Sequence, residues 1–293
     1  MRSTQFLYRT ILFLLPLVAY FIMNISVNHY LYSNQKLQLD TANILVIGDS
    51  HPTRSINPDF LQNAVSISQT AEPYVLTYWK LEKVLKTTKP SIVVVGLAPH
   101  NLSQFNDFKF SDSFWSLEMF KRSYPIQRFK EIDHLIEIDY KKYWEIYLKN
   151  NSFYPKLDHS YYIGGYSNSD LKSISGWKTS INRHYYFESE QLDISTVSIK
   201  YLDSIIELCQ KNDIEVFLVS SPVRKEYYDG IPERILIEFE KQKLKYRNKA
   251  FIFDKTDDFS YPDSLFRNSD HVNKFGAVVF TKELNRFIQK NQN

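Results

Sequence analysis

Glycine and cysteine are both scarce in this sequence. Seven glycines in 293 residues amount to about 2%, where roughly 7% is usual, so each glycine is expected where the backbone needs it. The single cysteine, Cys209, excludes an internal disulfide and any metal site built from several cysteines. A strong charge of one sign is missing too. The chain has 36 Lys and Arg against 33 Asp and Glu, which gives a formal net charge of +3. So small a net charge argues against a nucleic-acid partner.

The proportions that remain are those of a globular protein, with 43% hydrophobic and 24% charged residues. One run stands apart, because residues 10–27 carry no charge, and this length is near the lower limit of about 17–25 residues for a membrane-spanning helix. Arg2 and Arg9 precede the run and the next Lys or Arg is Lys36, which places the amino terminus in the cytoplasm by the positive-inside rule.

This pattern predicts a single-pass membrane protein whose main domain is extracytoplasmic, either periplasmic or extracellular. The predicted segments are a cytoplasmic amino terminus (1–9), a transmembrane signal anchor (10–27), a linker (28–42) and the main domain (43–293). A cleaved signal peptide and a buried soluble helix are the alternatives. No convincing small-x-small cleavage site follows the apolar run, which favours the uncleaved anchor.

Apolar runs of strand length alternate with segments of helical periodicity in the main domain. Residues 43–47, 91–97 and 213–220 are continuous apolar runs, typical of strands buried on both faces of a parallel sheet. Weaker strands are expected at 63–67 and 250–253, and helices at 77–86, 197–211, 232–245 and 276–289. The alternation predicts a three-layer α/β/α fold, flavodoxin-like, in which the three strong strands lie side by side and parallel.

Residues 105–187 interrupt this alternation. They hold 21 aromatic residues in 83, about one in four against 16% for the whole chain. We predict an aromatic-rich insertion outside the sheet, with a charged and aromatic helix over residues 124–150. The aromatic side chains form either the core of a small cap or a rim of Tyr and Trp that stacks on sugar rings, and the sequence leaves both open.

Two polar clusters lie at the ends of predicted elements. The first strand leads directly into Gly48-Asp49-Ser50, at the strand edge where open α/β sheets bind ligands. A serine nucleophile needs a base. His271 lies just ahead of the last predicted helix, and that loop can return to the same edge of the sheet. The sequence therefore predicts that Ser50 and His271 act as nucleophile and base.

These clusters resemble motifs of the SGNH (GDSL-type) hydrolase superfamily, over roughly residue 43 to the carboxyl terminus without the insertion. The resemblance implies that Ser50 is the nucleophile and that Asn101, displaced by two or three positions from the family's Gly-x-Asn, helps to hold the oxyanion. Residues 66–71 occupy the place of a second motif but lack its glycine, and Gln69 is the substrate-binding candidate there. Asn268 stands where the family's Asp-x-x-His motif has its aspartate.

Because of that asparagine, Asp270 is the candidate third member of the triad. His51 and His100 flank the expected site and are candidate substrate-binding or orienting residues. A zinc site formed by these histidines with Asp49 and Asp270 lacks paired-ligand spacing, so we expect neither a metal nor another cofactor. Arg54 and Arg224 are the nearest cations, either solvated or in contact with an anionic substrate.

The sequence resembles most the membrane-anchored SGNH-like proteins that modify cell-envelope polysaccharides. This resemblance implies a serine-dependent acyl ester hydrolase or O-acyltransferase, acting on acetyl groups of an acylated polysaccharide or a small ester. A membrane-bound acyltransferase is then a candidate partner. The alternative is a catalytically inactive envelope protein that binds glycan or a membrane partner. The absent glycine and Asn268 favour the alternative, and the intact Ser50 and His271 favour the enzyme.

Overall fold

The sheet of this computed structural model has five strands, all parallel, in the order β2-β1-β3-β6-β7. The strands are β1 (Ile44–Ile47), β2 (Ala64–Ser66), β3 (Ile92–Gly96), β6 (Glu215–Ser220) and β7 (Phe251–Asp254). The structure describes residues 2–34, 39, 42–124, 126–156, 162–168 and 176–292. β1, β3 and β6 are neighbours, which confirms the prediction made from the three apolar runs.

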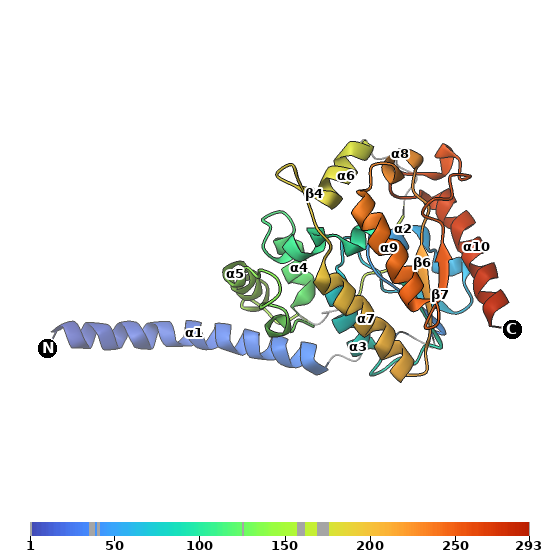
Figure 1. The fold of residues 1–293 in the computed structure, drawn as a ribbon. Helices are drawn as coiled ribbons and strands as arrows, with labels where there is room; N and C mark the ends of the chain where they lie inside the picture. The colour runs from blue at the N-terminus through green and yellow to red at the C-terminus, as the bar shows by residue number, and fades with distance from the viewer. Residues whose placement is uncertain are drawn as a thin grey trace.

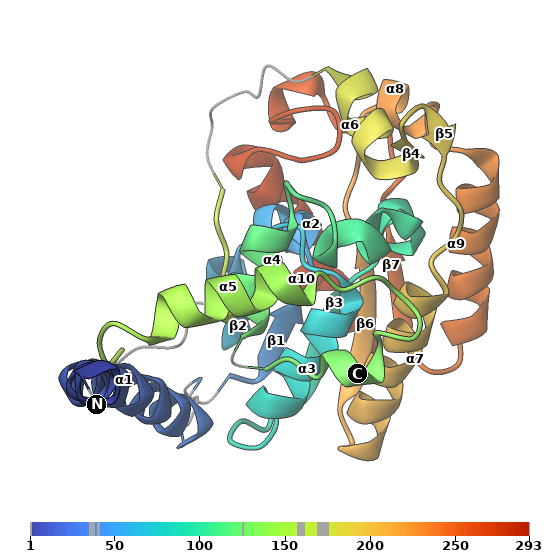
Figure 2. The same cartoon turned by 90° about the vertical axis from the view of Figure 1, so that its left-hand side faces the viewer.

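Helices cover both faces of the sheet, as Figures 1 and 2 show. Side chains alternate along each strand, so Leu45 packs into one core and Val46 into the other. The first core is covered by α3 (Tyr74–Val84), α7 (Thr196–Lys211) and α9 (Glu233–Tyr246), the second by α2 (Ser50–Ser55) and α10 (Lys274–Asn291). The predicted three-layer α/β/α fold is confirmed.

The aromatic region lies outside this sheet, as predicted. Its elements are α4 (Ser116–Ser123), α5 (Tyr140–Asn151), α6 (Trp177–Tyr185) and β4 (Tyr186–Phe187). β4 pairs with β5 (Glu190–Gln191), which follows the region. The short helix α8 (Lys225–Tyr228) lies later in the chain, after β6. Single 3-10 turns occupy Pro58–Phe60, Pro99–Leu102, Gln104–Phe110, Phe129–Glu131 and Asp263–Leu265.

Aromatic rings form much of the core of this cap. Phe110, Phe120 and Tyr143 surround Phe129 at ring-centroid distances of 5.3–5.7 Å, in the edge-to-face arrangement that aromatic pairs favour. Other rings of the region, such as that of Trp144, are exposed. The buried aromatic side chains therefore form the core of a small cap, which was one of the two interpretations that the sequence left open.

The helix predicted over 124–150 is wrong in its first half, where α5 begins only at Tyr140. The buried Phe129, Ile132 and Ile136 follow one another at intervals of three and four residues, which imitates helical periodicity. In the structure this stretch contains one short 3-10 turn at Phe129–Glu131.

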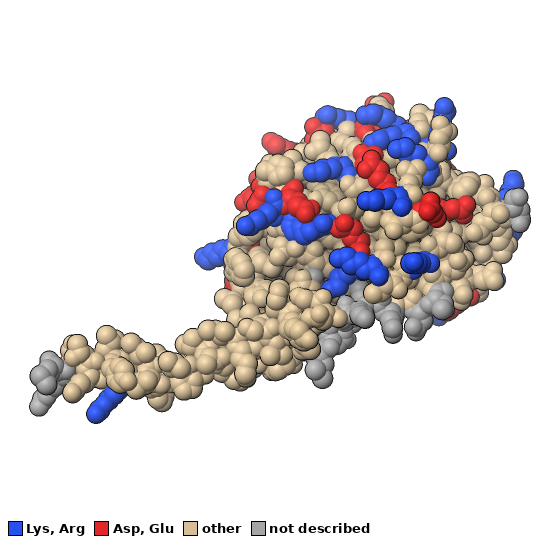
Figure 3. Space-filling view, turned by 90° about the horizontal axis from the view of Figure 1, so that it is seen from below, with Lys and Arg blue, Asp and Glu red and all other residues tan. Residues whose placement is uncertain are grey.

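The apolar amino-terminal run forms one long helix, α1 (Arg2–Asn34), which projects from the domain in Figure 1. Figure 3 shows almost no charged side chains along it, unlike the surface of the domain. It is long and apolar enough to cross a membrane. The helix continues to Asn34, so the predicted linker (28–42) is helical in its first seven residues.

The carboxyl-terminal half of α1 packs on the cap. Asn28 is fully buried; its amide donates to the carbonyl oxygens of Asn151 and Tyr154, both at 2.9 Å, and its side-chain oxygen accepts from Lys156 N–H. Asn24 donates to Ser152 O at 3.1 Å. Buried asparagines that satisfy backbone groups in this way fix the angle at which the helix leaves the domain.

Candidate active site

The turn between β1 and α2 places Ser50 at the carboxyl edge of the sheet. Gly48 has φ +128°, a conformation that favours glycine. Asp49 caps α2 by accepting from His51 N–H at 2.9 Å, which makes Ser50 the first residue of the helix. Gly96 at the end of β3 is also required, because a Cβ there would lie 2.7 Å from Pro52. These two glycines let α2 pack directly against the strand ends.

His271 meets Ser50 from the loop before α10. Its Nε2 lies 2.8 Å from Ser50 Oγ, so the two residues are within hydrogen-bond reach as the sequence predicts. Asn273 fixes the loop by accepting from the N–H groups of Phe275 and Gly276 at the start of α10. The serine and histidine thus come from opposite ends of the domain, each held by a helix cap.

Two oxygen atoms face the other ring nitrogen of His271. Nδ1 lies 3.2 Å from Asn268 Oδ1 and 3.2 Å from Asp270 Oδ2. The Asn268 oxygen also accepts from His271 N–H at 2.8 Å, so it is anchored toward the ring. The asparagine carbonyl can therefore accept the Nδ1 proton, while Asp270 supplies the negative charge that stabilises an imidazolium.

Asp270 is fully buried. Ser180 Oγ of α6 donates to its Oδ1 at 2.9 Å, and Arg183 lies 3.9 Å from its Oδ2. Burial alone opposes ionisation, but His271 and the other nearby histidines outweigh it and hold the pKa of Asp270 well below its usual range. Asp270 is therefore a charged carboxylate beside the base.

Asp49 organises a second buried network beside this one. His100 Nε2 lies 2.5 Å from Asp49 Oδ2, and Asn101 Nδ2 donates to the same oxygen at 2.9 Å. Asn101 Oδ1 accepts from Ala98 N–H. The Asn101 amide is thus directed to Asp49 and Asn101 does not line the cavity, which corrects the expectation that it faces an oxyanion.

His51 lies behind the reacting pair. Its ring centroid is 4.5 Å from that of His100 and 4.9 Å from that of His271, and its Nδ1 lies 3.2 Å from Ser221 Oγ. Burial is the main cause that lowers the pKa of His51 to about 3, so the ring is neutral. His51 does not line the cavity, and its place is that of a packing residue against His271.

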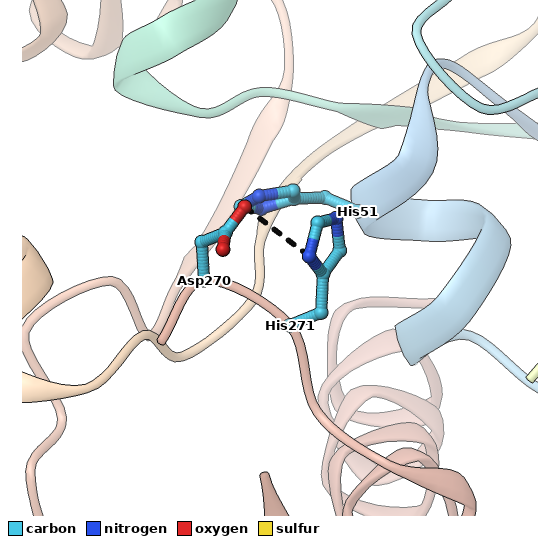
Figure 4. A group of neighbouring side chains, drawn as sticks. All are labelled: His51, Asp270 and His271. Atoms are coloured by element: carbon cyan, nitrogen blue, oxygen red, sulfur yellow. Dashed lines mark ion pairs between the residues drawn. The ribbon is translucent and has the colours of Figure 1, made fainter. Parts of the chain in front are cut away.

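Figure 4 shows how His51, Asp270 and His271 converge. Their potential ligand atoms lie within 4.8 Å of one another. The ring nitrogens of His271 already face Ser50 on one side and Asn268 and Asp270 on the other, so a metal ion bound to His271 would displace one of these contacts.

A cavity of about 200 Å³ opens at Ser50 and His271. His100 and Arg54 line it, whereas Gln69 does not. Arg224 lies elsewhere, paired with Asp263 at 2.6 Å. The other lining residues are Asp49, Thr70, Ala71, Phe105, Lys109, Trp115, Arg183, His184, Arg267 and Asn268.

Ala71 is the lining residue whose backbone is most unusual. Its φ of +62° is rare for a residue with a side chain, and it lies in the segment where the sequence lacks an expected glycine. Within the described part of the chain, neither Ala71 N–H nor Ser50 N–H has an acceptor. Both amides are available to a ligand, and nothing in the sequence reveals a left-handed alanine.

Lys109, Arg183 and His184 reach the cavity from the cap and were not anticipated from the sequence. None of the three is marked by a pattern in the sequence, because neighbouring positions point in different directions in a helix or a strand. Lys109 is 1% exposed.

No protein-family model and no curated protein sequence matches the chain. Among solved structures, it is similar to a GDSL-like lipase from Bacteroides thetaiotaomicron (13% identity, 90% of this chain and 98% of that one, TM-score 0.45). A candidate acylhydrolase from Bacteroides fragilis gives 13% identity over 91% and 95% of the two chains, with a TM-score of 0.44. It is also similar to a candidate platelet activating factor from Streptococcus pneumonia, with 11% identity over 94% of this chain and 98% of that one and a TM-score of 0.44.

Proposed function

We propose that this protein is a serine-dependent acyl ester hydrolase or acyltransferase. The observation that carries the proposal is the 2.8 Å contact between Ser50 Oγ and His271 Nε2, with the opposite nitrogen of the same ring facing Asn268 and the buried Asp270. A hydroxyl nucleophile, a histidine base and a group that orients the base are the parts that acyl transfer requires.

The geometry leads to a two-step reaction. Ser50 Oγ attacks the ester carbonyl while His271 Nε2 takes its proton, and the negative charge that develops on the carbonyl oxygen is met by the N–H groups of Ser50 and Ala71. The imidazolium then gives its proton to the leaving alcohol, which forms the acyl-enzyme. Water in a hydrolase, or a second hydroxyl in a transferase, attacks this intermediate with His271 again as base and releases Ser50.

The anchored location is part of the same proposal. α1 is a candidate membrane span, and its buried Asn24 and Asn28 bind the cap backbone. A cleaved signal sequence would have no reason to be bound in this way, so these contacts support a retained anchor. The placement of the domain outside the cytoplasm is proposed from Arg2 and Arg9, which precede the apolar run. An acetylated cell-envelope polysaccharide and a membrane-bound acyltransferase remain the proposed substrate and partner, on the basis of the sequence resemblance.

The alternative function is a catalytically silent, glycan-binding envelope protein. Asn268 at the family's aspartate position favours it, because an asparagine adds no charge to the base. The buried Asp270 carboxylate at the same 3.2 Å distance supplies that charge, and this favours the enzyme.

A serine-directed fluorophosphonate probe tests the two functions. If the protein is an enzyme, the probe labels the wild-type protein at Ser50 and does not label Ser50→Ala. The matched control is Ser204→Ala, at a half-buried α7 serine whose hydroxyl donates to Lys200 O, and it should be labelled at the wild-type rate. The wild-type protein and Ser204→Ala should also release acetate from an acetyl ester at equal rates, and Ser50→Ala should release none. A folded wild-type protein that neither reacts with the probe nor releases acetate would overturn the enzyme in favour of the glycan-binding alternative.

A further inference from the structure

The catalytic cavity is lined by cations. Arg54, Lys109, Arg183 and Arg267 all contribute to its wall. The one acidic residue in the same wall, Asp49, is already paired with His100. Arg183 lies 3.9 Å from the buried Asp270, whereas within the described residues neither Arg54 nor Lys109 forms an ion pair. The cavity wall is therefore positively charged, although the net charge of the whole chain is only +3.

Two of these cations adjoin the reacting pair in sequence. Arg54 lies four residues after Ser50, one turn along α2, and residues at this spacing share a helix face. Arg267 lies four residues before His271, in the loop that carries the base. Both arginines are partly buried, so their charges act in a region less screened than open solvent.

Within the described residues, the guanidinium of Arg54 makes no hydrogen bond and no ion pair. Burial, together with the charge of Arg267, lowers the pKa of Arg54, and Asp270 opposes that effect only in part, being engaged by Ser180 and His271. Two neighbouring arginines in a partly buried wall are stabilised when an anion binds between them.

Lys109 of the cap is a further cation in the cavity wall. Its Nζ donates to Ala71 O at 2.9 Å and to Asn106 Oδ1 at 2.7 Å, and it lies 4.2 Å from the centre of the Phe105 ring. Within the described residues, no carboxylate forms an ion pair with it. Lys109 thus fixes the Ala71 peptide and adds a further positive charge to the wall.

We propose that the substrate is a short-chain acyl ester that itself carries a carboxylate or phosphate group, bound by Arg54 and Arg267 beside the reacting carbonyl. This inference rests on the proposed function. A volume of about 200 Å³ is below the roughly 300–1,000 Å³ of pockets for drug-sized ligands, and a cationic wall does not solvate a long alkyl chain. An acetyl-sized acyl group with one neighbouring anion fits both the volume and the charge.

The test compares three esters on the full-length protein in detergent: phenyl acetate, 4-acetoxybenzoate and 4-acetoxyphenyl phosphate. They share the acyl group and differ in the charge on the leaving side. Arg54→Gln should lower kcat/KM for the charged esters by about 10- to 100-fold, as expected for the loss of a charge-assisted hydrogen bond, and lower it much less for phenyl acetate. The charged ester whose kcat/KM falls more in Arg54→Gln identifies the preferred anion as a carboxylate or a phosphate.

Two further variants complete the test. Arg54→Lys keeps the charge but loses the bidentate fork and should fall between wild type and Arg54→Gln. Arg286→Gln, an exposed arginine of α10, is the matched control and should leave all three rates unchanged. Circular dichroism melting of each variant verifies that the protein is folded.

Failure of this inference is distinguishable from failure of the proposed function. If wild type cleaves all three esters and Arg54→Gln lowers every rate by the same factor, the site is an esterase without selection for an anion. If wild type cleaves none of the esters and Ser50 does not react with the fluorophosphonate probe, the proposed function itself has failed.

Discussion

The sheet and the cap contribute different things to one cavity. The carboxyl edge of the sheet supplies Ser50 and His271, the groups that would exchange a proton and an acyl group. The cap supplies Lys109, Trp115 and Arg183, which shape and charge the wall. The chemistry therefore belongs to the α/β domain, whereas both regions supply the cations that would select the substrate: Arg54 and Arg267 come from the α/β domain, and Lys109 and Arg183 come from the cap.

One contact crosses this division. Ser180 belongs to the cap helix α6, and its hydroxyl donates to the buried Asp270 at 2.9 Å. The cap therefore also helps to orient the carboxylate beside the base. The predictions below separate the contributions of the two regions, beginning with the largest effect on turnover.

The largest effect is expected from the groups around His271 Nδ1. Asp270→Asn should lower kcat by about 10²–10⁴-fold, because it removes the charge that stabilises the imidazolium and can invert the tautomer. Asn268→Ala should lower kcat by a smaller factor, since the Asp270 carboxylate still faces the His271 ring. Asn268→Asp is the conservative comparison and should retain activity. Steady-state kinetics on a neutral acetyl ester measure all three, and a larger loss for Asn268→Ala than for Asp270→Asn would reverse these assignments.

How far the sequence could predict these residues depends on the region. β1, β3 and β6 were predictable because a strand buried on both faces is a continuous apolar run, and Ser50 was predictable because Gly48-Asp49 follows such a run directly. His271 was found because it precedes a recognisable helix. Each of these features is encoded locally, within a few residues of the chain.

Other parts of the site depend on contacts between distant segments. Asn101 was the nearest candidate to a motif asparagine, but its amide donates to Asp49, 52 residues away. Ala71 adopts a left-handed conformation that its residue type disfavours, and Lys109 is buried because Ala71 O and Asn106 accept its protons. Tertiary partners of this kind leave no periodic pattern in a single sequence.

Ser180→Ala tests whether the cap takes part in the chemistry. The variant removes one hydrogen bond to a buried carboxylate, worth about 1.5–3 kcal/mol when the acceptor is charged, so kcat should fall by about tenfold with KM nearly unchanged. Ser180→Thr keeps a hydroxyl and should recover part of the loss. A change in KM alone would place Ser180 in substrate binding and leave the orientation of Asp270 to the α/β domain.

The charge of Lys109 should make substrate choice depend on pH. Burial is the main cause that lowers the pKa of Lys109 to about 7; Arg122 and Arg183 lower it further, while Asp49 and Asp107 oppose them. Its ammonium is thus present below pH 7 and lost above it. The ratio of kcat/KM for 4-acetoxybenzoate to that for phenyl acetate should fall about fivefold from pH 6 to 8.5, which corresponds to about 1 kcal/mol.

Lys109→Met is the control for that pH dependence. It should lower both rates, because Ala71 O loses its donor, and it should make the ratio independent of pH over this range. If the ratio for Lys109→Met still falls between pH 6 and 8.5, another group controls the preference. Lys109 would then have no part in the preference for the anion, and the arginines of the wall would remain as its binding groups.

The smallest effect on turnover is expected where α1 meets the cap, although the effect on stability there is substantial. Asn28→Ala leaves Asn151 O, Tyr154 O and Lys156 N–H without their buried partner, which should cost about 1–3 kcal/mol. Asn34→Ala is the matched control, since that amide only donates to Tyr30 O at an exposed position of the same helix. In detergent, Asn28→Ala should melt at a lower temperature and be cleaved faster by protease near residues 151–156, with kcat within about twofold of wild type. If Asn28→Ala and Asn34→Ala have the same melting temperature, the buried asparagines do not fix the helix to the domain, and their contacts no longer support a retained anchor.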